Sequence, residues 1–126
     1  MTAKKLTLED LRDRALAADE EQYKEIHSDA LGGVIVARRL PTRRIMEIID
    51  ETDETMTSQF EANLRVIYES CSIFHDEQLR KQLEAAEPYD VVERLLGGNI
   101  HAVALVANEI IDMYGLQEDM VEELKN

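Results

Sequence analysis

The stretch that decides the fold runs from Gly32 to Asp50 and reads GGVIVARRLPTRRIMEIID. It opens with two glycines and the β-branched run VIV, which is typical of a turn followed by a β-strand. Pro41 then lacks a backbone donor and biases Leu40 away from helical geometry, so the strand has to end there. The apolar residues after Pro41 recur at helical spacing. The stretch therefore predicts a strand that leads through one corner into a helix.

The residues before this stretch complete a β-hairpin. The sequence DALGG, at 29–33, supplies turn residues and glycines that tolerate a positive φ angle. We expect a hairpin at about 22–40, with strands near Gln22–Ser28 and Gly33–Leu40. Because a two-stranded hairpin is marginal in water, it must pack against helices.

Helices are predicted on both sides of the hairpin. An N-terminal helix at 8–18 begins at TLED, where Thr7 and Asp10 form a capping box. A helical region follows at 42–115. Its first predicted elements are a short helix capped by Thr42 with the apolar face Ile45, Met46, Ile48 and Ile49, and a long helix with the continuous stripe Phe60, Leu64, Ile67, Cys71 and Phe74. The next are a helix capped by Asp76 with Leu79, Leu83 and Ala86 inward, and a helix from Pro88 to Gly97-Gly98.

The last part of the helical region predicts the centre of the fold. The sequence from Asn99 to Tyr114 is apolar nearly all round, so we expect a central helix buried on most sides that stops at Gly115. It is interrupted only by a narrow polar stripe of His101, Asn108, Glu109 and Asp112. The segment 116–126 reads LQEDMVEELKN and is either a final helix or an acidic tail.

Composition agrees with a mainly helical single domain. The chain has 126 residues, 44% of them hydrophobic, with only 5 glycines and 2 prolines. That length suffices to bury a core without a disulfide or a metal. We therefore predict a mainly α fold with a small N-terminal β-hairpin (α+β), a compact single-domain helical bundle covering residues 1–126.

The charge is unevenly distributed along the chain. Residues 1–44 carry nine basic and eight acidic side chains, whereas residues 45–126 carry five basic and nineteen acidic ones, giving the total of −13. The acidic part disfavours binding to nucleic acid or to anionic membranes. One cysteine, no signal peptide and no long apolar run lead us to expect a soluble intracellular protein.

The sequence offers no recognisable catalytic or metal-binding arrangement. The histidines at 27, 75 and 101 lack the spacing of a zinc site, and Cys71 lies on an apolar stripe, where it is expected to be a buried small hydrophobe. The DETDET sequence at 50–55 lacks the ligand pattern of a calcium loop, and the Gly-Gly pairs lack a phosphate-binding motif. We expect no enzyme activity, no cofactor and no metal.

The candidate binding residues fall into two groups. The first, here called the arginine cluster, is Arg38, Arg39, Arg43 and Arg44. It could form ion pairs within the domain, contact nucleic acid, or provide a basic edge for a protein partner. The second is the apolar stripe Leu116, Met120 and Leu124, which could dock on the protein's own core or on a partner.

The order of the elements resembles a known family. The hairpin strand GGVIVARRL is followed by LRVIYESCSIFHDEQLRKQ at 64–82 and by EPYDVVERLLGGNIHAVALVANEIIDMYGL at 87–116. Over about Tyr23–Leu116 the chain is similar to the XkdN-like family of phage tail assembly chaperones. The residues that carry this resemblance are Gly33 with Arg38-Arg39-Leu40, Tyr68-Glu69-Ser70 and Tyr114-Gly115-Leu116.

The resemblance implies a function and partners. Members of this family bind the tape-measure protein, keep it soluble in the host cytoplasm until tail-tube subunits assemble around it, and are absent from the finished virion. A frameshifted long form recruits the tail-tube protein in many phages, and this chain corresponds to the short form. The arginine cluster would then offer a basic edge to acidic client segments or to another copy of the chain. Two alternatives remain open: a small nucleic-acid-binding regulator that uses the Arg38–Arg44 edge, and a structural tail or connector subunit.

Overall fold

The predicted hairpin is present in the computed structural model, which describes residues 3–20 and 22–115. Strands β1 (Tyr23–Ser28) and β2 (Gly33–Arg38) pair antiparallel, from Tyr23 opposite Arg38 to Ser28 opposite Gly33. Gly32 closes the turn with a φ of +75°, a conformation that L side chains rarely adopt. One face of the hairpin is buried through Ile26, Ile35 and Ala37.

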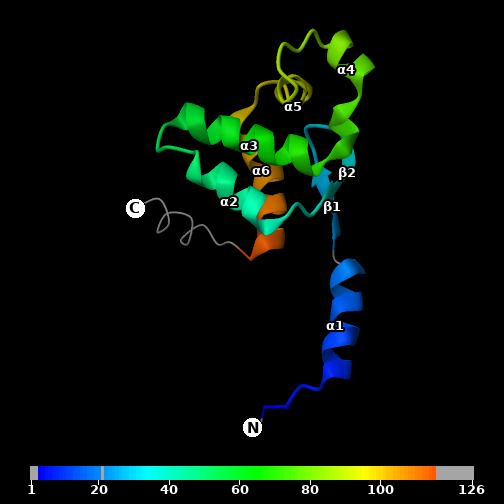
Figure 1. Cartoon of the computed structure of the whole chain (residues 1–126). Helices are drawn as coiled ribbons and strands as arrows, with labels where there is room; N and C mark the ends of the chain where they lie inside the picture. The colour runs from blue at the N-terminus through cyan, green and yellow to red at the C-terminus, as the bar shows by residue number, and fades with distance from the viewer. Residues whose placement is uncertain (1–2, 21, 116–126) are drawn as a thin grey trace.

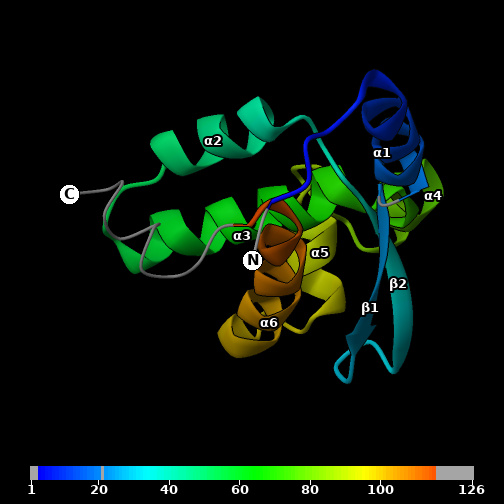
Figure 2. The same cartoon turned by 90° about the horizontal axis from the view of Figure 1, so that it is seen from below.

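The helical body follows the hairpin. Its elements are α2 (Thr42–Asp50), α3 (Met56–Ser70), the 3₁₀ turn η1 (Ser72–His75), α4 (Glu77–Gln82), α5 (Asp90–Leu95), α6 (Ile100–Ile111) and the 3₁₀ turn η2 (Asp112–Tyr114). Helix α6 packs against α3 and against β1, while α2 and α5 also contact α3 (Figures 1 and 2). The mainly α architecture with a small N-terminal β-hairpin is therefore confirmed, and the hairpin lies on the helices as expected.

One hydrophobic core joins the hairpin to these helices. Ile26 of the hairpin, Ile45 of α2, Ile67 of α3, Val91 of α5 and Ile110 of α6 are all fully buried in it. Cys71 is also fully buried, as the apolar stripe predicted. The Lys24 ammonium ties the hairpin to α6 from outside the core, since its Nζ lies 3.0 Å from Glu109 Oε2 and donates to the Glu109 carbonyl at 2.9 Å.

Helix α1 (Leu8–Glu20) stands away from this body (Figure 1). It begins at the predicted capping box: the Thr7 amide donates to Asp10 Oδ2 at 2.8 Å, and the Asp10 amide donates to Thr7 Oγ1 at 3.2 Å. None of its described apolar side chains is buried, and Leu8 and Leu11 are more than half exposed. Local hydrogen bonding and helix propensity, rather than packing, set the bounds of α1.

Several predicted helix ends are confirmed. Asp76 Oδ1 accepts from the Leu79 amide at 2.8 Å to cap α4, and Asn99 Oδ1 accepts from the Ala102 amide at 2.9 Å to cap α6. Gly97 and Gly98 both take positive φ angles after α5, and Gly115 does so after η2. These ends depend on side chains a few residues away or on glycine geometry, and both are visible in a sequence.

Three details at α2 and α3 were wrong. Pro41, not Thr42, occupies the N-cap of α2, and no side chain caps that helix. Met46 is 51% exposed, because only Ile45 and Ile48 of α2 turn fully into the core. Helix α3 ends at Ser70, and Phe74 reaches the core from η1 instead. Helical spacing cannot separate one long helix from a helix followed by a 3₁₀ turn, since both keep residues three or four apart on one side.

Three further expectations on the later helices also need correction. Helix α4 ends at Gln82, because Glu84 adopts a φ of 53° and the Ala85 amide donates back to the Arg80 carbonyl, so Ala86 lies beyond the helix and is exposed. Helix α5 begins at Asp90 rather than at Pro88. Helix α6 is not buried on most sides, since Leu105 on it is 53% exposed. In the described ranges, no helix is long and apolar enough to cross a membrane.

Candidate partner-binding surface

The arginine cluster splits into two pairs with different surroundings. Arg39 and Arg44 are held by the fold, whereas Arg38 and Arg43 are exposed and have no side-chain partner among the described residues. The spacing of the four arginines in the sequence does not reveal this difference. This difference in surroundings decides which arginines are available to bind a partner.

Arg44 is a structural residue of the α2–α3 packing. Its Nε donates to Glu69 Oε1 at 2.7 Å and its Nη2 donates to Glu69 Oε2 at 2.8 Å, while Nη1 reaches Glu47 Oε2 at 3.1 Å. The hydrogen bonds that the Arg44 guanidinium donates to Glu69, and then to Glu47, raise its pKa above the ordinary value. A two-pronged pair of this kind fixes the geometry of both side chains. For Arg44, the interpretation as an internal ion pair therefore holds.

Arg39 fastens the corner after β2 to the end of α6. Its Nη1 donates to the Met113 carbonyl at 2.9 Å, and its guanidinium lies 4.9 Å from the centre of the Tyr114 ring. The Leu40 amide donates to the Tyr114 hydroxyl at 2.7 Å. Burial raises the pKa of that hydroxyl, although the Leu40 amide and the Arg39 charge oppose the shift. The segment Arg39-Leu40 after β2 is therefore held against the segment Met113-Tyr114 at the end of the described chain.

Arg38 belongs to the outer face of the hairpin, which sequence reasoning missed. On that face Arg38 lies opposite Tyr23, Val36 opposite Glu25, and Val34 opposite His27. Tyr23 is 62% exposed, Val36 51% and Val34 47%. We call Tyr23, Val34, Val36 and Arg38 the hairpin face. The signal was present in the sequence, because strict alternation places Val34 and Val36 on the side opposite Ile35.

The hairpin face has the composition of an interaction surface. An aromatic ring, two valines and an arginine lie on one side of the hairpin, together with Glu25 and His27, and tyrosine and arginine are enriched at protein interfaces. Arg43 adds a second exposed cation at the start of α2. The stripe Leu116, Met120 and Leu124 lies outside the described residues.

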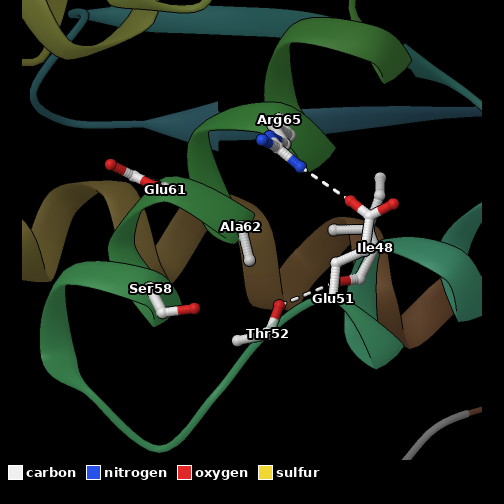
Figure 3. A pocket seen from close by; sticks show the side chains of 7 residues that line it. All are labelled: Ile48, Glu51, Thr52, Ser58, Glu61, Ala62 and Arg65. Atoms are coloured by element: carbon white, nitrogen blue, oxygen red, sulfur yellow. Dashed lines mark hydrogen bonds and ion pairs between the residues drawn. The ribbon is translucent and has the colours of Figure 1, made fainter.

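A small cleft lies between α2 and α3 (Figure 3). Its volume of about 50 Å³ has room for one or two water molecules. Most of its polar side chains are already engaged: Arg65 Nη1 donates to Glu51 Oε2 at 2.9 Å, Thr52 Oγ1 donates to the Ile48 carbonyl at 2.6 Å, and Ser58 Oγ accepts from the Asp53 amide at 2.9 Å. The hydrogen bonds around this cleft connect the end of α2 and the loop after it to α3.

The histidines and acidic groups do not gather into a metal-binding arrangement within residues 3–20 and 22–115. His75 Nε2 lies 2.6 Å from the Tyr68 carbonyl, and its ring contacts that of Tyr68. Burial raises the pKa of the Cys71 thiol to about 12, so the thiolate needed for nucleophilic chemistry does not form near neutral pH. The expectation that the protein is not an enzyme stays a prediction.

The fold and the surface define a small α+β domain whose hairpin exposes an aromatic ring, two valines and charges of both signs. Comparison of the chain with protein-family models, with curated proteins and with solved structures found no match in any of the three. The resemblance to the XkdN-like family therefore stays a hypothesis.

Proposed function

We propose that this protein is a phage tail assembly chaperone that binds apolar helical segments of a tape-measure protein through the hairpin face. The observation that carries the proposal is the hairpin face itself, on which Tyr23, Val34 and Val36 are exposed beside Arg38, which has no side-chain partner within residues 3–20 and 22–115. A long coiled-coil client exposes apolar stripes before its helices pair with those of other copies, and covering such stripes opposes aggregation. The resemblance to tail assembly chaperones supplies the identity of the client.

The charge of the chain suits this role. A complex whose chaperone carries a net charge of −13 repels other copies of itself, which keeps an aggregation-prone client in solution. The exposed cations Arg38, on the hairpin face, and Arg43, at the start of α2, then attract acidic client segments. In this proposal the protein acts in the cytoplasm of the bacterial host, and the finished virion does not contain it.

A co-expression experiment tests the proposal. A tape-measure protein is expressed with and without this chain, and its soluble fraction is measured together with co-purification. We expect rescue by the wild type and loss of rescue with Val34→Thr, Val36→Thr and Arg38→Glu combined. Valine and threonine have similar shapes, so this variant removes apolar contacts with little change in strand geometry.

The matched control changes equally exposed residues elsewhere. Leu105→Gln on α6 and Arg94→Glu on α5 also remove an exposed apolar side chain and an exposed cation. We expect this control to rescue the client like the wild type. A client that stays insoluble with the wild type, or that is soluble alone, contradicts the chaperone proposal.

Nucleic-acid binding through the arginine cluster receives less support from the geometry. Arg44 is paired with Glu69 and Arg39 is bound to the end of α6, which leaves only Arg38 and Arg43 of the cluster available for phosphates. Two phosphate contacts give a shallow dependence of affinity on salt. A steep fall of affinity for random duplex DNA with rising salt would favour this alternative. A structural tail or connector subunit would be detected by mass spectrometry of purified particles.

A further inference from the structure

Helix α1 presents an apolar stripe to solvent. Leu8, Leu11, Ala15 and Ala18 recur at spacings of three and four and so share one side of the helix, and all four are exposed. Figure 1 shows α1 apart from the helical body. The protein thus maintains a well-formed, capped helix whose apolar side has no cover in the described chain.

The edges of this stripe are positively charged. At 100° per residue, Arg12 lies along one edge of the stripe and Arg14 along the other, while Glu9 and Asp13 lie on the opposite side of α1. Neither arginine has a side-chain partner among the described residues. Two α1 helices paired antiparallel would bring like arginines together across both edges, so the stripe favours an acidic occupant over its own copy.

The described chain ends close to the base of α1. Arg39 is bound to Met113 through its side chain, and its amide donates to the Gln22 carbonyl at 2.6 Å, two residues after α1 ends. Helix α1 and η2 therefore lie at the same end of the molecule (Figure 1). Gly115, the last described residue, directly follows Tyr114, whose hydroxyl accepts from the Leu40 amide at this end.

The sequence of the segment 116–126 complements α1. Leu116, Met120 and Leu124 recur every four residues, and four carboxylates against one lysine give the segment a net charge of −3. In helical form Asp119 and Glu123 lie along one edge of this stripe. Eleven helical residues would be about 16 Å long, compared with about 20 Å for α1.

We propose that residues 116–126 pack antiparallel along α1 of the same chain. Leu116, Met120 and Leu124 cover Leu8, Leu11, Ala15 and Ala18, and the carboxylates of Asp119 and Glu123 face Arg14 at one edge of the stripe. This assigns an occupant to both unpartnered stripes of the chain. It does not depend on the chaperone proposal, because the pairing forms in the isolated protein. Any partner that uses α1 has to displace the segment first.

Cysteine cross-linking tests the pairing. In an antiparallel register Ala15 faces Met120 and Leu11 faces Leu124, so we use the double variants Ala15→Cys with Met120→Cys and Leu11→Cys with Leu124→Cys. The native Cys71 is fully buried and does not interfere. The matched control is Leu16→Cys with Met120→Cys, since Leu16 is 68% exposed and lies one residue further along α1, on a different side.

We expect a disulfide within one chain, seen as a faster-migrating monomer on a non-reducing gel, at a rate independent of protein concentration. The two facing pairs should close at least about tenfold faster than the Leu16 control, because a docked segment has a high effective concentration. Adding Arg14→Glu should remove this advantage, and further adding Asp119→Lys and Glu123→Lys should restore it.

Two results would overturn the proposal. Equal closure rates for the facing pairs and the Leu16 control would mean that the segment has no preferred side of α1. Cross-linked dimers whose rate rises with protein concentration would mean that the occupant is a second copy. Circular dichroism of each variant shows whether the fold is retained, and all substituted positions of α1 are exposed.

Discussion

At the scale of single residues, Arg43 and Arg44 are neighbours in the sequence with opposite roles. Arg44 makes two hydrogen bonds to Glu69 and a third to Glu47, whereas Arg43 has no side-chain partner among the described residues. Both lie in the first turn of α2, where the helix dipole disfavours a cation. Only Arg44 gains enough from its partners to offset that effect.

Replacing each arginine by methionine should separate these roles. Arg44→Met should lower the free energy of unfolding by about 1 kcal/mol, a value kept small because the pair is partly exposed. Arg43→Met should change it by no more than about 0.5 kcal/mol. Urea unfolding of the two variants measures both values. Equal losses would mean that the Arg44–Glu69 pair contributes nothing to stability.

Cys71 should make the protein sensitive to alkali. Burial raises the pKa of its thiol to about 12, well above the value of a free thiol. Below the free-thiol pKa the thiol is neutral in both states; above it, the unfolded chain loses a proton that the folded chain keeps, so stability falls as pH rises. Between about pH 8.5 and 10 the wild type should lose about 1 kcal/mol more than Cys71→Ala. Urea unfolding at several pH values measures this difference, and parallel losses would show that Cys71 titrates normally in the fold.

At the scale of elements, the parts that sequence predicts well are those with local causes. The capping residues Asp76 and Asn99 and the glycines after α5 act within a few residues, so their patterns are readable. The end of α3 at Ser70, the exposure of Met46 and the Arg44–Glu69 pair depend on elements distant in sequence, and no spacing encodes them. The hairpin face is intermediate in predictability. Once 33–38 is assigned as a strand, the alternation of its side chains predicts which residues share the outer face.

Helix α1 should respond to acid independently of the body. The Thr7 amide, and then Lys4, lower the pKa of the Asp10 carboxyl. A lowered pKa means that Asp10 supports α1 above its ordinary pKa and that this support is lost as pH falls through the lowered value. We expect the Cα chemical shifts of α1 to move toward coil values in that range while those of α6 hold.

The substitution Asp10→Asn isolates this effect, with Asp13→Asn as its control in the next turn. The first should weaken α1 at neutral pH and abolish the acid response, whereas the second should leave both unchanged. The urea midpoint of the core should be the same in both variants, because α1 lies outside the core. A lower midpoint for Asp10→Asn alone would show that α1 stabilises the body.

At the scale of the whole molecule, the distribution of charge opposes the compact state. Residues 45–115 carry fifteen carboxylates and only four lysines or arginines. Two of those four cations, Arg65 and Arg80, are already engaged, with Glu51 and with the carbonyls of Ala85 and Ala86. Folding therefore concentrates unscreened negative charge on one small body.

Salt should accordingly stabilise the protein. Raising sodium chloride from about 10 to about 150 mM shortens the screening length from about 30 to about 8 Å, which weakens the repulsion among scattered carboxylates more than it weakens close pairs such as Arg44–Glu69. The melting temperature should rise by a few degrees. The variant Glu54→Gln with Glu61→Gln removes two exposed carboxylates and should show a higher melting temperature at low salt and a smaller rise. A melting temperature that falls with salt would mean that the ion pairs, and not the excess of like charge, dominate the electrostatics of the fold.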